Sequence, residues 1–157
     1  MLTDVKDKVV WITGASSGIG AAAAVALSEA GARVIVSGRR EDRLNALAQT
    51  LDGAEVAVLD VSDATAVNAV VAMILEKFGR IDILVHSAGL NIKNRAWSEL
   101  TIEDWNTVIQ VDLNGAFYCC QAVLPFMRTQ KDGLIINISS WAGRYVSRVS
   151  GGAYSAA

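Results

Sequence analysis

Short apolar runs alternate with longer amphipathic stretches along this chain, and the two patterns have different periods. The apolar runs are rich in β-branched residues, which is typical of buried strands. The stretches between them repeat apolar residues every three or four positions, which is typical of helices that bury one face. The apolar runs predict strands at Lys8–Thr13, Arg33–Ser37, Glu55–Leu59, Ile81–His86 and Leu134–Ile138.

Two of the predicted helix boundaries carry their own signals. Gly31 follows the first helical stretch, and glycine readily adopts the left-handed conformation that ends helices. The Thr101 hydroxyl can accept a hydrogen bond from the N–H of Asp104 and so start a helix. The helical pattern predicts Gly18–Ala30, Glu41–Leu51, Asp63–Phe78 and a longer helix from Thr101 to about Pro125–Arg128.

Strands that alternate with helices predict a parallel sheet covered by helices on both faces. Right-handed crossovers make this the doubly wound α/β arrangement, the Rossmann fold. No linker, repeat or low-complexity segment interrupts the pattern, so residues 1–157 are expected to form a single domain. The run Leu134–Ile138 is apolar on both faces, which suits the interior of a sheet. Because no later strand follows it here, we expect a fold that is incomplete at its C-terminal side.

Composition narrows the class of protein without indicating an activity. The 157 residues are 52% hydrophobic and 19% charged, which is ordinary for a globular domain. A formal net charge of -2 gives no basic surface for nucleic acid or an anionic membrane. The first residues lack the apolar core of a signal peptide, which predicts a cytoplasmic protein. Cys119 and Cys120 are adjacent on a predicted helix and are expected to be small buried residues, not disulfide or metal ligands.

A glycine-rich turn, Thr13–Gly20, joins the first strand to the first helix. Such a turn points unpaired backbone N–H groups and the positive end of the helix dipole at a ligand, which favours a phosphate. Gly14 permits the tight turn, Gly18 lets the backbone approach a pyrophosphate, and Gly20 lets the helix pack on the strand. The spacing G-x-x-x-G-x-G differs from the usual dinucleotide fingerprint, and the alternative is an ordinary structural turn. The predicted phosphate site also includes the intervening Ser16, Ser17 and Ile19.

The end of the second strand indicates which dinucleotide binds. A carboxylate there would accept a hydrogen bond from the ribose 2′-hydroxyl of NAD, whereas an arginine accommodates the 2′-phosphate of NADP. The chain reads Val36-Ser37-Gly38-Arg39-Arg40 at this point and offers no carboxylate. The Arg39 guanidinium can donate a planar set of charged hydrogen bonds to a phosphate. We therefore favour NADP(H), with NAD(H) as the other cofactor; alternatively, both arginines are simply solvated.

Several motifs together resemble those of the short-chain dehydrogenase/reductase family. They are the glycine turn, Asp60-Val61, Ala88-Gly89, Ile138-Ser139-Ser140 and Tyr154. The resemblance covers the whole chain and implies an NAD(P)-dependent oxidoreductase that moves hydride between nicotinamide C4 and a carbonyl or alcohol carbon of a small molecule. It also implies that Asp60 and Val61 border the adenine, and that the Ala88 and Gly89 backbone borders the adenosine ribose. Family members usually self-associate through the long helix and the helix that Tyr154 begins, so the resemblance implies a homo-oligomer for the intact protein.

Ser140 and Tyr154 match the catalytic serine and tyrosine of that family. A phenol can donate the proton that a carbonyl oxygen needs after hydride delivery, and a second hydroxyl can orient that oxygen. A free tyrosine has a pKa of about 10, so the chemistry requires a nearby cation. The family supplies a lysine four residues after the tyrosine, whereas this chain ends at Ala157 with a carboxylate. We therefore expect a fragment of a longer chain with little or no turnover.

Two positions depart from the family pattern. Asp112, in Val111-Asp112-Leu113-Asn114-Gly115, replaces the usual asparagine. Poor helix formers in the middle of a long helix favour a functional position, so Asp112 is counted with the catalytic residues; alternatively, it is an exposed helical aspartate. His86 precedes Ser87-Ala88-Gly89 where asparagine is usual, and a structural hydrogen bond is expected there instead of acid–base catalysis.

Three functions compete on this basis. The leading hypothesis is the catalytic region of an NADP-dependent carbonyl reductase or alcohol dehydrogenase. The second is a nucleotide-binding module without catalysis, and the third is a methyltransferase-like Rossmann enzyme. Trp97 and Trp141 are expected to be core or site-wall residues. Arg144 and Arg148 are expected to be solvated or to receive an anionic group, and no residue selects a particular substrate.

Overall fold

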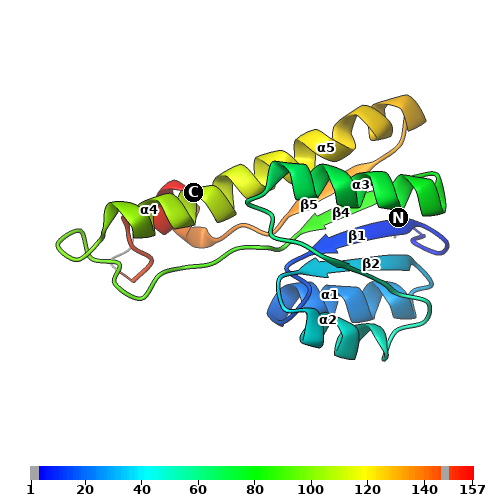
Figure 1. The fold of residues 1–157 in the computed structure, drawn as a ribbon, viewed down its shortest axis with the longest axis horizontal. Coiled ribbons are helices and arrows are strands. Elements are labelled where there is room, and N and C mark those ends of the chain that lie inside the picture. Colours follow the sequence, from blue (N-terminus) through cyan, green and yellow to red (C-terminus); the bar gives the residue numbers. More distant parts are fainter. Residues whose placement is uncertain (1–3, 146–148) are drawn as a thin grey trace.

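Five parallel strands form a single sheet at the centre of the molecule (Figure 1). The computed structural model describes residues 4–145 and 149–157. The strands lie in the order β3-β2-β1-β4-β5, and every neighbouring pair is parallel. The order reverses between β1 and β4, which confirms the doubly wound fold. The bounds are β1 (Val9–Thr13), β2 (Arg33–Gly38), β3 (Glu55–Val58), β4 (Ile83–His86) and β5 (Leu134–Asn137).

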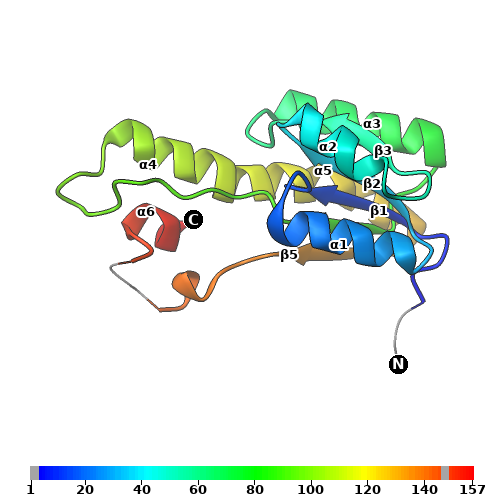
Figure 2. The ribbon, with the colours of Figure 1, turned by 90° about the horizontal axis from the view of Figure 1, so that it is seen from below.

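Helices cover both faces of the sheet because each parallel crossover has to pass over one face. α1 (Gly18–Glu29) and α2 (Glu41–Ala48) lie on one face, and α3 (Ala64–Phe78) and α5 (Gly115–Gln130) lie on the other. The shorter α4 (Ile102–Val108) and α6 (Gly152–Ala156) lie beyond the carboxyl ends of the strands. Both views show α6 beside α4 (Figures 1 and 2).

Alternate side chains of the strands pack into two separate cores. On β1, Val10 and Ile12 belong to the cluster under α1 and α2, whereas Val9 and Trp11 belong to the cluster under α3 and α5. The indole N–H of the buried Trp11 donates to Ser37 Oγ at 2.9 Å, so this polar group is satisfied inside the core. All residues of β1 are buried, as expected for the central strand of a sheet covered on both faces.

The predicted long helix is helical throughout but changes pitch in its middle. Thr101 Oγ1 accepts the N–H of Asp104 at 3.0 Å, which confirms the predicted cap of α4. A π-helical segment, η1 (Ile109–Asn114), separates α4 from α5. A π turn holds an extra residue and is frequent at functional sites. The poor helix formers identified in the sequence lie in this segment or directly after it.

Several element boundaries differ from the predicted ones. β4 begins at Ile83 instead of Ile81: the N–H and C=O of Ile81 bond to the side chain of Gln130, although the N–H of Asp82 still donates to the Val9 carbonyl. α2 ends at Ala48 and not at Leu51. α1 ends at Glu29, one residue before the predicted Ala30, and Gly31 at φ +85° follows the C-cap.

β5 is one of the two edge strands of the sheet and is only partly covered (Figure 2). Ile135 packs against the core under α5. On the opposite face Leu134, Ile136 and Ile138 are each at least 39% exposed. Among the described residues no strand pairs with its outer edge. This strand is therefore apolar on both faces but packed against a core on only one of them.

Candidate active site

A cleft of about 1080 Å³ opens at the carboxyl ends of the strands, beside the point where the strand order reverses. Ligands bind at this place in open α/β sheets. Gly20 lies beneath the cleft, where it is buried. The other residues predicted for the site all line the cleft: Gly14, Ser16, Ser17, Gly18, Ile19, Arg39, Asp60, Val61, Ala88, Gly89, Asp112, Ser140 and Tyr154.

The turn between β1 and α1 is tight at one end and open at the other. Gly14 has φ +68°, and a Cβ there would lie 2.6 Å from the backbone nitrogen of Ala88. A Cβ on Gly20 would lie 2.6 Å from the carbonyl oxygen of Gly14, so the helix packs directly on the turn. Gly18 has φ +57°, yet no described atom lies within 4 Å of a Cβ placed on it. Open space therefore faces the first N–H groups of α1, which fits a phosphate.

The two arginines after β2 take different positions. Arg39 is exposed at the cleft. Arg40 instead reaches the glycine turn, where its Nη2 donates to Ser16 Oγ at 2.8 Å and to Ser17 Oγ at 2.7 Å. Arg40 is exposed as well, so it contacts solvent in addition to these two hydroxyls. No local pattern signals this contact, because only the fold brings the end of β2 beside the turn.

Asp60 organises the loop after β3. Its Oδ1 accepts the N–H of Ser62 at 3.0 Å and the Ser62 hydroxyl at 2.7 Å, and its Oδ2 lies 4.0 Å from Arg39 Nη1. Partial burial acts to raise the pKa of Asp60, but the Ser62 hydrogen bonds and the charge of Arg39 together hold it below its usual value. The ion pair with Arg39 is long and exposed, so it is weak and leaves Arg39 able to bind an anion.

His86 lies at the floor of the cleft, at the end of β4. Its Nδ1 is 2.9 Å from Thr13 Oγ1, and the same hydroxyl oxygen accepts the N–H of Ala88 at 3.3 Å. The expected structural hydrogen bond is thus confirmed. Burial lowers the pKa of His86 to about 4, so the ring is neutral at pH 7. His86 therefore joins β1 to β4 without adding charge to the cleft.

Asp112 lines the cleft from the π-helical segment. Its Oδ1 accepts the N–H of Leu90 at 2.8 Å, which fixes the loop that follows β4. Burial raises the pKa of Asp112, and the hydrogen bond from Leu90 offsets only part of that effect. The alternative of an exposed helical aspartate is wrong, because the side chain is half-buried and bonded.

Ser140 and Tyr154 reach the cleft from separate segments. Ser140 follows β5, and its Oγ accepts the N–H of Ala142 at 3.2 Å at the start of the 3-10 turn η2 (Trp141–Gly143). Tyr154 lies in α6, which contacts η1 and α4. Both side chains are half-buried. The fold thus gathers Ser140, Tyr154 and Asp112, the three predicted catalytic residues, around one cleft.

The other aromatic and basic candidates that the structure describes, Trp97, Trp141 and Arg144, lie outside the cleft lining. Trp97 and Trp141 are 74% and 63% exposed, so the prediction that they are core residues is wrong. Neither of them lines the cleft. The Arg144 guanidinium lies 5.5 Å from the ring centroid of Tyr145. Arg148 lies outside the described residues.

The two cysteines differ in environment. Cys119 is buried, and burial raises the pKa of its thiol to about 12, so the thiol stays protonated. Cys120 is only half-buried, so the expectation of two buried cysteines holds for Cys119 alone. Within residues 4–145 and 149–157, no three His, Cys, Asp or Glu side chains gather where they could hold a metal ion. No helix in this part of the chain has the length and apolar character needed to cross a membrane.

Comparison with known proteins identifies the family. The family model described as short chain dehydrogenase matches residues 8–157. The chain therefore belongs to the short-chain dehydrogenase family, a family of oxidoreductases. This membership decides against the methyltransferase-like alternative.

Individual relatives agree with the family assignment. An uncharacterized oxidoreductase from Staphylococcus saprophyticus is 44% identical over 148 residues, which are 92% of this chain and 59% of the relative. The crystal structure of serine dehydrogenase from Escherichia coli has a TM-score of 0.87 and 36% identity, and the match covers 94% of this chain and 68% of that one. A short-chain dehydrogenase from Streptomyces avermitilis has a TM-score of 0.89 and 38% identity over 96% of this chain and 55% of that one. The chain spans 59% to 62% of the length of the first curated relatives.

Proposed function

We propose that the protein is an NADP(H)-dependent oxidoreductase that interconverts a carbonyl and an alcohol on a small molecule. The observation that supports this best is one cleft that the glycine turn, Arg39, Ser140 and Tyr154 all line. One end of the cleft offers groups suited to a phosphate-bearing nucleotide, and the other offers hydroxyls suited to a carbonyl oxygen. We take residues 1–157 as one domain. This chain spans about three fifths of the length of its relatives, so we propose the activity for the whole protein.

The nucleotide end of the cleft is built mainly from backbone groups. In our proposal the pyrophosphate binds the first N–H groups of α1, where the helix dipole is positive and Gly18 leaves space. Arg39 binds the 2′-phosphate, since it is exposed at the cleft and is the more available of the two neighbouring arginines. Asp60 and Val61 border the adenine, and Ala88 with Gly89 borders the adenosine ribose.

The catalytic end of the cleft is built from side chains. The bound nicotinamide supplies or accepts the hydride. Tyr154 moves the proton at the substrate oxygen, and the Ser140 hydroxyl orients that oxygen by a hydrogen bond. Asp112 supports this end by holding Leu90 in place.

Cofactor preference tests the nucleotide part of the proposal. Replacement of Arg39 by alanine removes a charged hydrogen bond donor to a phosphate, an interaction of about 1.5–3 kcal/mol. We expect the Kd for NADPH, from tryptophan fluorescence titration, to rise roughly 10- to 100-fold, and the Kd for NADH to change by less than about 3-fold. Arg43→Ala is the matched control, because Arg43 is exposed on α2 and does not line the cleft. Tighter binding of NADH than of NADPH by the unchanged protein would contradict the proposal.

Substrate turnover tests the catalytic part. The name of the Escherichia coli relative gives serine as its substrate, so small hydroxylated amino acids come first among the alcohols to assay. We expect Tyr154→Phe to abolish turnover, measured by the absorbance of the reduced cofactor. Tyr145→Phe should leave turnover unchanged, since Tyr145 is 57% exposed and does not line the cleft. Full activity of Tyr154→Phe would refute the role of the phenol.

We further propose that the protein forms a homo-oligomer through the long helix. Phe117 on α5 is 62% exposed, and Leu113 and Leu124, four residues before it and seven after it on the same helix face, are exposed too. Large apolar side chains in solvent along one helix are typical of an interface. Analytical ultracentrifugation of Phe117→Asp should show a smaller species than the unchanged protein. A cytoplasmic location stays a prediction from the sequence.

A further inference from the structure

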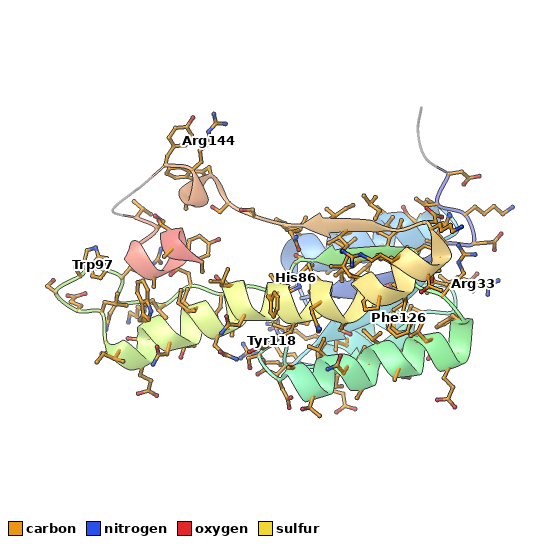
Figure 3. All side chains as sticks on the ribbon, turned by 90° about the horizontal axis from the view of Figure 1, so that it is seen from above. Arg33, His86, Trp97, Tyr118, Phe126 and Arg144 are labelled. Atoms are coloured by element: carbon orange, nitrogen blue, oxygen red, sulfur yellow. The ribbon has the colours of Figure 1, made fainter. Side chains whose placement is uncertain are left out.

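The loop after β4 lies against the segment that leads into Tyr154, although the two are far apart in the sequence. Trp97 of this loop lies next to α6 in Figure 3. We infer that Arg95, in the same loop, is a positioning residue for Tyr154. The inference rests on the proposed catalytic role of Tyr154 and adds a device that holds its helix over the cleft.

Hydrogen bonds from the loop reach two consecutive carbonyls of that segment. Arg95 Nη1 donates to the carbonyl oxygen of Val149 at 2.7 Å, and Arg95 Nε donates to the carbonyl oxygen of Ile92 at 2.8 Å. Asn91 Nδ2 donates to the carbonyl oxygen of Ser150 at 3.0 Å. One guanidinium therefore ties its own loop to the chain just before Tyr154, with the charged donor that makes such bonds strong.

Two glycines bring the segments into direct contact. Gly151 has φ +79°, and a Cβ there would lie 2.6 Å from Arg95 Cβ. A Cβ on Gly152 would lie 2.5 Å from Trp97 Cζ2. The Trp97 ring in turn stacks against Trp105 of α4, with 6.1 Å between centroids. A side chain at either glycine would push the loop and α6 apart.

The loop is also held at its other end. Asp112 accepts the N–H of Leu90, so the loop is fixed to η1 before it reaches the segment at Val149. α6 itself spans only Gly152–Ala156, and an isolated helix of that length is not stable in water. The position of Tyr154 therefore depends on contacts from outside its own helix, and Arg95 supplies the charged ones among the described residues.

A phenol that transfers a proton has to stay within hydrogen-bond reach of the reacting oxygen. Misplacement of a reacting group by about 1 Å can lower the rate about 100-fold. Loss of the Arg95 bonds should therefore lower kcat and leave the distant nucleotide turn unaffected.

The experiment compares Arg95→Ala with Lys93→Ala, an exposed cation of the same loop, in the whole protein with NADP⁺ and serine, the first alcohol to assay. We expect kcat of Arg95→Ala to fall about 10- to 100-fold, and its Kd for NADPH to stay within about 2-fold. Arg95→Lys should recover part of the loss, because a lysine can still donate to the Val149 carbonyl. Lys93→Ala should match the unchanged protein. An unchanged kcat in Arg95→Ala, or an equal loss in Lys93→Ala, overturns the inference.

Amide hydrogen exchange gives a readout that needs no turnover. The N–H of Ser155 bonds to Gly151 at 3.2 Å, and the N–H of Ala157 bonds to Ala153 at 3.1 Å. Both amides should exchange at least about 10-fold faster in Arg95→Ala if the loop holds α6. Unchanged exchange overturns the inference even if the protein proves to be inactive. Suppose that exchange is faster in Arg95→Ala but the Tyr154→Phe variant remains active. The proposed function would then be refuted, whereas the finding that Arg95 holds α6 in place would stand.

Where Arg95→Ala does not fold by circular dichroism, Gly152→Ala replaces it. The added methyl group meets the Trp97 ring, so the same loss of kcat and the same faster exchange are expected. Replacing Trp97 by leucine as well removes the ring that the new methyl group meets. In the double variant, kcat and the amide exchange rates should therefore return toward those of Trp97→Leu alone. A double variant no better than Gly152→Ala overturns the inference.

Discussion

Thr13 Oγ1 and His86 Nδ1 lie 2.9 Å apart and join the ends of β1 and β4 beneath the cleft. The two residues are register partners in the sheet, so the bond closes a pair that the backbone already aligns. Among the described residues the other ring nitrogen, Nε2, has no hydrogen bond partner. His86 is thus a buried polar group that is satisfied on one side only.

The burial of His86 predicts a loss of stability in mild acid. The pKa of His86 is about 4 in the folded chain and about 6.5 when unfolded, so the unfolded state binds more protons between these values. The contribution of buried, neutral His86 to the free energy of unfolding should therefore be fully present above pH 6.5. The free energy of unfolding should fall by about 3 kcal/mol as the pH drops to about 4, at about 1.36 kcal/mol per pH unit. Urea unfolding at a series of pH values measures this. His86→Gln has no titrating ring, and the same acid loss in that variant would refute the assignment.

Gly18 and Gly53 form a matched pair that separates nucleotide binding from folding. Their φ angles are +57° and +61°, and no described atom lies within 4 Å of a Cβ at either position. Alanine at either site should cost a similar amount of stability, about 1–2 kcal/mol, for the left-handed backbone. Only Gly18→Ala should weaken NADPH binding, by about 10-fold or more, because its methyl group enters the space before α1. Equal effects of the two variants on the Kd would argue against a phosphate at the turn.

Asp82 and Asp132 both lie near Lys8, yet they should differ in their effect on stability. Asp82 is 3% exposed, and its Oδ2 accepts the N–H of Val9 at 2.8 Å. Asp82→Ala leaves this buried amide unsatisfied and should lower the free energy of unfolding by about 2–3 kcal/mol. Asp132 is exposed, so Asp132→Ala should cost less than about 1 kcal/mol. Thermal unfolding compares the two, and a larger loss in Asp132→Ala would contradict this account.

We expect the carboxylate of Asp112 to lower the stability of the folded chain at neutral pH. Burial raises its pKa in the folded chain, so the folded state binds the proton more tightly than the unfolded state does. The contribution of Asp112 to stability should be fully present below its unfolded pKa and lost as pH rises through the folded value. Asp112→Asn keeps an acceptor for the N–H of Leu90 and should be more stable than the unchanged protein at pH 7, by urea unfolding. If Asp112→Asn were less stable than the unchanged protein, a neighbouring group would have to stabilise the ionised carboxylate of Asp112.

The sheet and its two cores could be predicted from the sequence because their signals are local. The β-branched runs predicted all five strands, and the helical repeats predicted most helix ends to within a few residues. Gly31 and Thr101 marked two helix boundaries directly. The residues of the cleft could also be predicted, since motifs at the ends of parallel strands meet at one edge of the sheet.

Other features depend on where distant segments meet, and no local pattern reveals them. Arg40 reaches Ser16 and Ser17 only because β2 pairs with β1. Arg95 reaches Val149 only because two loops on the ligand side lie together. The poor helix formers around Asp112 signalled an irregular helix, but a π turn, a kink and a break share that signal.

The π-helical segment has a consequence for how this chain tolerates insertions and deletions. α5 packs on α3, whereas α4 and η1 contact α6, so the two halves of the long helix have different neighbours. Deletion of one residue within 109–114 would remove the extra residue of the π turn and give this segment a uniform α-helical pitch, which redirects the side chains of the segment itself. Asp112 would then turn away from Leu90, and the loop after β4 would lose this bond. A surface loop would tolerate the loss of one residue, whereas the same deletion within 109–114 should inactivate the protein. The length of this segment is therefore as constrained as its sequence.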